Sequence, residues 1–259
     1  MSILVDSHCH LDRIDLAPFD GKLEAALAAA EALQVGCMLC VCIDMENFPA
    51  VLDIAERFTK VFASVGKHPT EWEGEEPTIA SLVAKADHPK VIAIGETGLD
   101  YFHGLETERA AQQSRFITHI QAAKQAGKPL IIHTRQAQAD TISILKQEQA
   151  ESGVFHCFTE SWDMARQGLD LGLYISFSGI VTFKNALELK EVAKKVPLDR
   201  ILVETDAPYL TPAPYRGKPN TPGYTRYVAE HIAELRGIPY ERLRDVTTEN
   251  FQRLFKIQL

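Results

Sequence analysis

Short apolar segments alternate with segments of helical periodicity along the whole chain. The apolar segments have the length of buried strands, and their near-continuous hydrophobicity is typical of parallel strands covered on both faces. Eight such strands are expected, and they begin at Ile3, Val35, Val61, Val91, Pro129, Gly153, Tyr174 and Ile201. Their regular spacing along the chain indicates repeated strand–helix units.

Between these strands, apolar residues recur at the i, i+3, i+4, i+7 spacing of an amphipathic helix. Two clear examples are Leu23, Ala26, Leu27 and Ala30, and Leu189, Val192, Ala193 and Val196. The long segment 106–127 ends in Gly127, which is a common helix stop, just before Pro129. Segment 241–257 is expected to form one or two closing helices.

Eight strand–helix units in 259 residues predict a single (β/α)8 TIM barrel over residues 1–259, in the α/β class. A barrel of this kind needs roughly 250 residues. The alternative is a doubly wound open sheet. Five of the thirteen prolines lie between Asp206 and Gly223, where they predict a rigid loop over the C-terminal mouth of the barrel. Barrel enzymes carry their active sites at this mouth.

Composition narrows the class of protein. The formal net charge is −8, which argues against a large footprint on duplex DNA but does not exclude a nuclease. The five cysteines are an odd number, so a disulfide framework is not expected, and Cys37 and Cys40 in an apolar run should simply be buried. Without a signal peptide or a long apolar span, we expect a soluble cytoplasmic protein with no membrane contact and no obligate protein partner.

The stretch VDSHCHLD in the first expected strand contains two histidines that flank a cysteine. Side chains in a strand alternate between its two faces. His8 and His10 should therefore point in the same direction, toward the mouth of the barrel. Cys9 should point the other way and pack against the helices.

Further polar side chains are expected at the C-terminal ends of the other strands. These are His68, Glu96, His133, His156 and Asp206. Burying so many titratable groups together would be costly without a cation. Imidazoles and carboxylates suit zinc, manganese and similar ions. The six candidate ligands, which are more than one catalytic ion needs, are His8, His10, Glu96, His133, His156 and Asp206. We therefore expect two divalent metal ions (zinc, manganese or magnesium) that share a bridging carboxylate.

Seven motifs in order, DSHCHLD, GETGLDY, IIHTR, FHCF, SGIVTFKN, VETDAPYL and RGKPN, resemble the TatD family of metal-dependent hydrolases within the amidohydrolase-like superfamily. The resemblance extends from Asp6 to Phe255 and is close to the YcfH-like branch. It implies a TIM barrel with two divalent ions that hydrolyses phosphodiesters, with DNA as the usual substrate.

The resemblance also implies specific roles. One ion would be held by His8, His10, Glu96 and Asp206, and the other by Glu96, His133 and His156. Glu96 would thus be the bridge, and a hydroxide held between the ions would attack phosphorus. Asp206 could be a ligand alone or also the base that accepts the proton of the nucleophile. Glu204 could orient a ligand histidine from behind or be an ordinary core acid.

Three side chains are candidates for binding substrate phosphate, namely His68, Arg135 and Arg216. Two positions depart from the family pattern, Lys67 before His68 and Gln136 after Arg135, and we expect both to lie near the substrate. Lys218 is a further, weaker candidate. The remaining histidines, His88, His103, His119 and His231, are expected to be ordinary residues of helices or loops, and Ser178 to serve packing.

These features predict a two-metal hydrolase that is a deoxyribonuclease or another phosphodiesterase. One alternative is a related hydrolase that cleaves a C–N or lactone bond in a small molecule. A groove lined by cations would favour nucleic acid, whereas a closed apolar pocket would favour the small substrate. A barrel that binds metal only as an assembly partner is a third alternative, but it would not need an open site for two ions.

Overall fold

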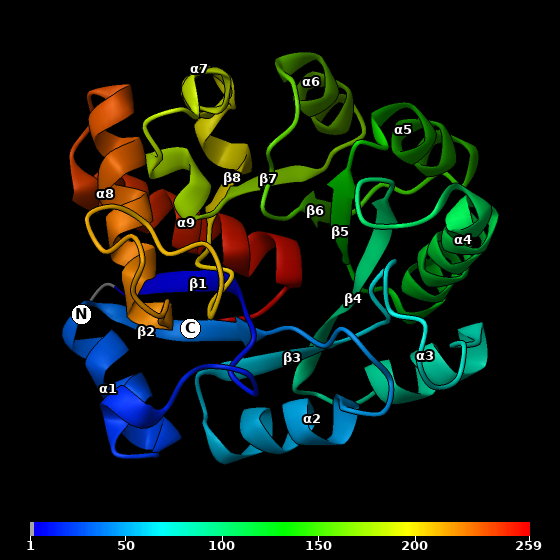
Figure 1. The fold of residues 1–259 in the computed structure, drawn as a ribbon, viewed down its shortest axis with the longest axis horizontal. Coiled ribbons are helices and arrows are strands. Elements are labelled where there is room, and N and C mark those ends of the chain that lie inside the picture. Colours follow the sequence, from blue (N-terminus) through cyan, green and yellow to red (C-terminus); the bar gives the residue numbers. More distant parts are fainter. Residues whose placement is uncertain (1–2) are drawn as a thin grey trace.

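The computed structural model describes residues 3–259 and confirms the (β/α)8 barrel (Figure 1). Eight strands form one sheet in which each strand pairs in parallel with the next in chain order. The strands are β1 (Leu4–Cys9), β2 (Val35–Cys40), β3 (Val61–Val65), β4 (Val91–Asp100), β5 (Leu130–Arg135), β6 (Gly153–Phe155), β7 (Tyr174–Phe177) and β8 (Ile201–Val203).

The helices form an outer ring around the strands (Figure 1). They are α1 (Leu23–Ala32), α2 (Phe48–Arg57), α3 (Ile79–Ala86), α4 (Arg109–Ala126), α5 (Gln138–Gln147), α6 (Trp162–Asp170), α7 (Leu187–Lys195), α8 (Thr225–Arg236) and α9 (Tyr240–Phe255). Helix α4 ends at Gly127, whose φ of 66° is the left-handed conformation of a glycine stop. The predicted closing segment is a single helix, α9.

The seam between the first and last strands closes the barrel. The Asp206 N–H donates to the carbonyl of His8 at 3.0 Å, and the His10 N–H donates to the carbonyl of Ala207 at 2.8 Å. Both bonds join β1, or the residue after it, to the segment that follows β8. They exclude the open sheet that sequence left as the alternative.

The buried carboxyl group of Asp6 strengthens this seam. Its Oδ1 accepts the Thr205 N–H at 2.9 Å, and its Oδ2 accepts the Thr205 hydroxyl at 2.5 Å. Burial raises the pKa of Asp6 to about 7, although the bonds from Thr205 act in the opposite direction. The side chain of Asp6 thus adds two hydrogen bonds across the seam just beyond the short strand β8.

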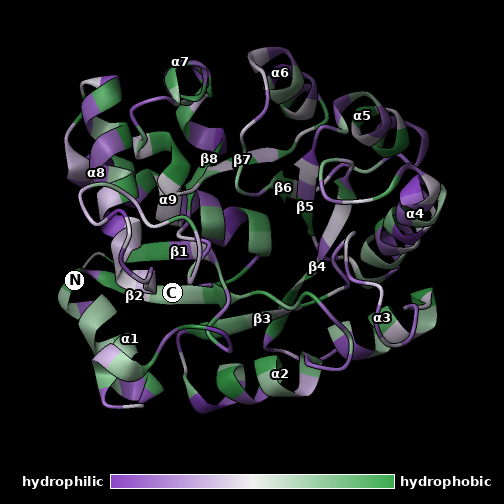
Figure 2. Cartoon of the chain, viewed as in Figure 1, coloured by the Kyte–Doolittle hydropathy of each residue, from purple (hydrophilic) through white to green (hydrophobic). Residues whose placement is uncertain are grey.

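Apolar side chains fill two regions, one inside the barrel and one between the strands and the helices. The inner region contains Val5, Leu39 and Ile131, and Phe251 and Phe255 of α9 pack against it. The helices alternate between hydrophobic and hydrophilic residues, as their amphipathic pattern requires (Figure 2). No helix within residues 3–259 is both long and apolar enough to cross a membrane.

All eight predicted strands are present, but some of the polar residues expected at strand ends lie beyond the strands. The strand from Ile201 stops at Val203, so Glu204 and Asp206 lie in the loop that follows it. The strand from Val61 likewise stops at Val65, before His68. Some polar residues near the mouth therefore sit on loops just after the strands, whereas Glu96 and His133 lie within β4 and β5.

Candidate metal centre

A change of register in β1 sets the direction of the two N-terminal histidines. The pairing of β1 with β2 shifts between Asp6 and Cys9. Ser7 contacts Ser176 of β7, and the next residue, His8, contacts Glu96 of β4. Two consecutive side chains thus face the interior. Cys9 is fully buried in the layer between strands and helices, which confirms the predicted facing of this cysteine.

Four side-chain atoms converge around His8 and form a first group of donors. His8 Nε2 lies 3.3 Å from His10 Nε2, 3.3 Å from Glu96 Oε2 and 3.6 Å from Asp206 Oδ1. His10 Nε2 lies 3.4 Å from Asp206 Oδ1 and 4.0 Å from Glu96 Oε2. These are the four residues that the family resemblance assigned to one ion.

The second oxygen of Glu96 faces a different group of imidazoles. Glu96 Oε1 lies 2.8 Å from His156 Nε2 and 3.3 Å from His133 Nδ1. The same oxygen lies 3.3 Å from Nε2 of His68, which sequence placed with the substrate contacts. The structure therefore brings all six predicted ligands together and adds His68 to the second group.

The spacing of these donors fits a bound cation. A tetrahedral ion with bonds of roughly 2.0–2.1 Å separates its ligand atoms by about 3.3 Å. The closest distances in the first group, between His8 Nε2 and both His10 Nε2 and Glu96 Oε2, have this value. The rings of His8 and His156 stack at 3.9 Å, so both could not carry a proton without strong repulsion. A metal ion relieves this conflict because it binds neutral imidazoles.

The carboxyl groups of the site are held in their charged form. Burial opposes the charge of Glu96, but the neighbouring His156 and His68 outweigh it and keep the pKa of this carboxyl well below its usual range. Burial also opposes the charge of Asp206, but the neighbouring His10 and His8 outweigh it and lower the pKa of this carboxyl. Both side chains are therefore carboxylates at neutral pH, which is the form that binds cations.

Contacts behind the donors fix their orientation. His10 Nδ1–H donates to the carbonyl of Val41 at 3.0 Å, which leaves Nε2 with a free lone pair. Nδ1 of His156 faces Glu204 Oε1 at 3.4 Å. The same oxygen of Glu204 accepts the Cys157 N–H at 2.7 Å. Glu204 thus lies where it can orient His156, one of the two roles considered from sequence.

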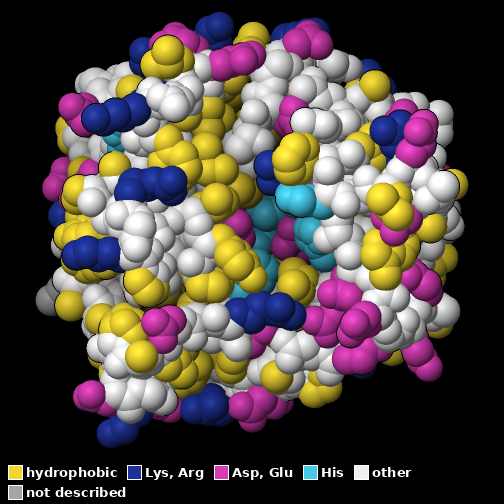
Figure 3. All heavy atoms as spheres, in the orientation of Figure 1, with side chains coloured by type: hydrophobic (Ala, Val, Ile, Leu, Met, Phe, Trp, Pro, Cys, Tyr) yellow, Lys and Arg dark blue, Asp and Glu magenta, His cyan; other side chains and the backbone are white. Residues whose placement is uncertain are grey.

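The donors lie at the bottom of a hollow at the C-terminal end of the barrel. This hollow is the mouth of the barrel, and it has a volume of about 800 Å³. Histidine and carboxylate side chains lie at its centre, and hydrophobic side chains surround much of its rim (Figure 3). The histidines that line it are His10, His68, His103, His133 and His156. Tyr209 and Leu210, from the proline-rich loop, form part of the wall, as the loop prediction required.

The two arginines predicted to contact substrate have different positions. Arg135 lines the mouth, and its guanidinium lies 4.2 Å from the centre of the Phe102 ring. Arg216 is not among the lining residues. Its guanidinium lies 3.7 Å from the centre of the Phe183 ring, a contact that braces the proline-rich loop.

Lys67 and Gln136 do not lie where sequence placed them. Lys67 is fully buried, and its ammonium donates to the carbonyls of Glu73 at 2.7 Å and Glu75 at 3.1 Å. It therefore anchors the loop after β3. Gln136 is exposed with a φ of 53°, and its N–H donates to Glu160 at 3.1 Å, outside the mouth. The expectation that these two residues affect substrate choice is not supported by their positions.

Asp100 is a polar residue of the site that sequence reasoning missed. It is only 1% exposed at the end of β4, and its Oδ2 accepts His133 Nε2–H at 3.1 Å. Burial opposes its charge, but the hydrogen bonds from His133 and His103 hold the pKa of Asp100 well below the usual range. Asp100 therefore fixes the ring of His133 with Nδ1 toward Glu96.

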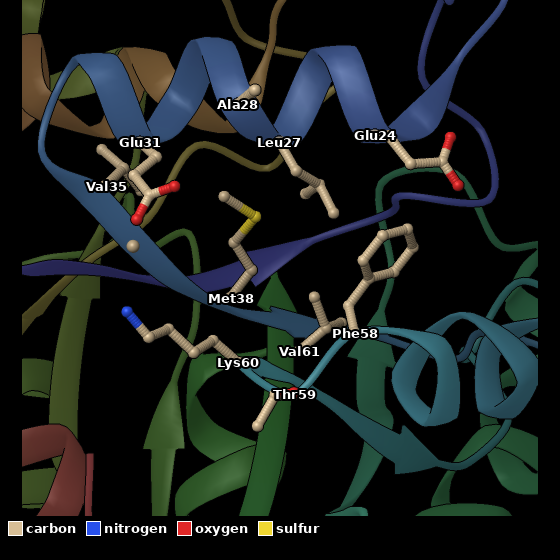
Figure 4. A pocket seen from close by; sticks show the side chains of 11 residues that line it. Glu24, Leu27, Ala28, Glu31, Val35, Met38, Phe58, Thr59, Lys60 and Val61 are labelled. Carbon is tan, nitrogen blue, oxygen red and sulfur yellow. The ribbon is translucent and has the colours of Figure 1, made fainter.

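A second cavity, of about 380 Å³, lies between α1, β2 and the start of β3. The side chains of Leu27, Met38 and Phe58 point toward this space, with Lys60 at its edge (Figure 4). It contains no histidine and shares no lining residue with the mouth. The chemistry-bearing side chains are thus concentrated at one end of the barrel.

The opposite facing of Cys9 and His10 makes a direct prediction about metal content. Cys9→Ala should leave the number of bound ions unchanged and weaken only the packing between strand and helices. His10→Ala removes one donor of the first group and should lose the ion bound there. Elemental analysis of both variants after metal reconstitution is the measurement, with thermal unfolding as a check on folding. Equal loss of metal from both variants would contradict the assigned facing.

Comparison with known proteins agrees with the barrel fold and with a metal-dependent hydrolase. The family model described as TatD related DNase matches residues 5–256. The chain is 47% identical to the uncharacterized metal-dependent hydrolase YcfH of Escherichia coli K12, over 98% of this chain and 96% of that protein. It is 42% identical to YabD of Bacillus subtilis 168, an uncharacterized metal-dependent hydrolase, over 98% and 100%. The crystal structure of YjjV, a TatD homolog from Escherichia coli K12, matches with a TM-score of 0.91 and 31% identity over 98% of each chain. The chain therefore belongs to the TatD family of metal-dependent hydrolases.

Proposed function

We propose that this chain is a two-metal phosphodiesterase whose substrate is DNA. The observation that carries the proposal is the position of the Glu96 carboxylate. Its Oε2 lies 3.3 Å from His8 Nε2, whereas its Oε1 lies 2.8 Å from His156 Nε2. A carboxylate shared by two groups of donors supports a site for two adjacent ions. Such pairs of ions serve phosphatases and nucleases.

In this proposal, each ion has its own group of ligands. The first would be held by His8, His10, Glu96 and Asp206, and the second by Glu96, His133 and His156, with His68 within reach. A donor set so rich in imidazole favours zinc over magnesium, and its two carboxylates also suit manganese. When bound, the ions would supply Lewis acidity, which polarises a phosphoryl oxygen and makes water a stronger acid.

Two residues of the chain would act on the substrate directly. Asp206 is ionised and its side chain is 13% exposed at the mouth, so it can accept a proton from the attacking water. Arg135 lines the same mouth, and its planar guanidinium suits the oxygens of a phosphodiester. The description of the matched family as a DNase supports DNA as the polymer.

A second candidate is hydrolysis of a C–N or lactone bond in a small molecule. Within residues 3–259, Arg135 is the only lysine or arginine that lines the mouth. Ile43, Ile180 and Leu210 add apolar surface to the walls. A small apolar substrate would find more complementary surface here than a long polyanion would.

A comparison of substrates separates the two candidates. The protein, reconstituted with zinc or with manganese, is incubated with single-stranded DNA, duplex DNA and a panel of small amides and lactones. We expect cleavage of DNA that a chelator abolishes. The Asp206→Asn variant, purified in parallel, must lose this cleavage, which excludes a contaminating nuclease. Turnover of an amide or lactone without cleavage of either DNA would favour the second candidate.

A further inference from the structure

His103 lies at the mouth, although sequence suggested an ordinary loop residue. Its Nδ1–H donates to Asp100 Oδ2 at 2.8 Å, and its side chain is 54% exposed. The ring of Phe102 packs edge-on against it at 4.7 Å. No hydrogen bond from Nε2 of His103 to another residue is found within the described part of the chain. This nitrogen is therefore available to a ligand in the mouth.

The carboxylate behind His103 is fixed on all sides. Oδ1 of Asp100 accepts the backbone N–H groups of Phe102 at 2.9 Å and His103 at 2.8 Å. Its Oδ2 accepts His133 Nε2–H as well as His103 Nδ1–H. One buried carboxylate thus connects an exposed imidazole to a histidine of the metal centre. An imidazole oriented by a third group in this way is suited to acid–base catalysis.

His10, His68 and Arg135, which also line the mouth, are less suited to donate a proton. Both ring nitrogens of His10 already have partners. Nδ1 faces the carbonyl of Val41, and Nε2 lies 3.4 Å from Asp206 Oδ1. His68 has Nδ1 2.8 Å from Thr70 Oγ1 and Nε2 facing Glu96. Arginine side chains do not release a proton in proteins, so Arg135 cannot be the acid. His103 is therefore the histidine of the mouth with a free nitrogen and a fixed orientation.

We propose that His103 is the general acid that protonates the leaving group, an inference that rests on the proposed phosphodiesterase function. The oxygen of water forms the new bond to phosphorus, and Asp206 accepts the proton of that water. As the bond from phosphorus to the leaving oxygen breaks, its electron pair stays on this oxygen, which takes the proton from His103 Nε2. The products are a phosphate monoester and an alcohol. His103 regains a proton from solvent, to which it is exposed.

Two phosphodiesters of thymidine whose leaving groups differ in their need for this proton test the proposal. The thymidine dinucleotide TpT expels an alkoxide, which needs a proton, whereas the 4-nitrophenyl ester of thymidine monophosphate expels a stable phenolate. In the His103→Gln variant, we expect turnover of TpT to fall by about 10²–10⁴-fold, the usual range for general acid–base help. Turnover of the nitrophenyl ester should change by less than about 10-fold. The control is His88→Gln, because His88 is a surface residue that pairs with Glu56 at 3.2 Å.

The other outcomes have distinct meanings. Equal losses on both substrates, or a rise in KM alone, would show that His103 binds phosphate and would overturn the proposal. A lower metal content in His103→Gln would also overturn it, because the residue would then act on the ions through Asp100 and His133. If the metal-loaded wild type cleaves neither ester, the phosphodiesterase function itself is wrong, and so is the role of His103 as its general acid.

Discussion

Replacing Asp206 by asparagine should give a folded protein whose turnover is lower by about 10²–10⁴-fold. Asparagine keeps the size of the side chain and tolerates the left-handed backbone of this position, where φ is 57°. The backbone bond from residue 206 to His8 at the seam is also kept. The amide cannot accept a proton from water and brings no negative charge to the first group of donors.

The Asp206→Asn variant should still bind an ion at the second group, since within residues 3–259 no hydrogen bond or ion pair joins His133 or His156 to residue 206. Circular dichroism and elemental analysis would show fold and metal content beside the rate. Arg135→Gln is the matched comparison, because it removes a rim contact and no donor. The Arg135→Gln variant should have a higher KM and an unchanged metal content. An Asp206→Asn variant as active as the wild type would place the catalytic centre elsewhere.

Glu96→Gln should reduce metal binding from about two ions per chain to one or none, because the bridge is lost. A glutamine has one neutral oxygen, so its NH₂ group must face either His8 or His156, and it cannot act as a ligand there. Activity should fall at least as far as in Asp206→Asn. Stoichiometry measured by elemental analysis, together with the affinity of each ion by calorimetry, tests this expectation.

Glu204→Gln is the control for the bridge. Both residues are buried carboxylates next to His156, but Glu204 faces only Nδ1 of that ring, on the side away from the other donors. Loss of such a supporting contact typically weakens metal binding by about 10–100-fold. Both ions should therefore still bind to Glu204→Gln at high metal concentration. Two ions bound tightly to Glu96→Gln would show that this carboxylate is not the bridge.

The sequence predicted the barrel and the main donors because both follow from simple periodicities. Eight buried strands with helices between them leave few other folds, and polar residues at strand ends must meet at one mouth. The same reasoning could have found Asp100, which lies four residues after Glu96 on the same strand and therefore on the same face.

Other positions could not be obtained from periodicity. The register shift in β1, which turns both Ser7 and His8 inward, depends on pairing with the neighbouring strand. The burial of Lys67 depends on the path of the loop at 73–75, whose carbonyls receive its protons. Arg216 turned out to stack on Phe183 because of tertiary packing that no local pattern records. Long flexible side chains were thus the least predictable part of the site.

The seam that closes the barrel joins residues that the ribosome adds early and late in synthesis of the chain. Asp6 and Thr205, which bond across it, are 199 positions apart. His8 and His10 leave the ribosome long before Asp206, and until then β1 is an unpaired edge. A nascent chain that stops at Val203 therefore lacks one carboxylate of the first donor group. The assembly of this centre is tied to completion of the last strand, so a partly made chain cannot carry the whole hydrolytic site into the cell.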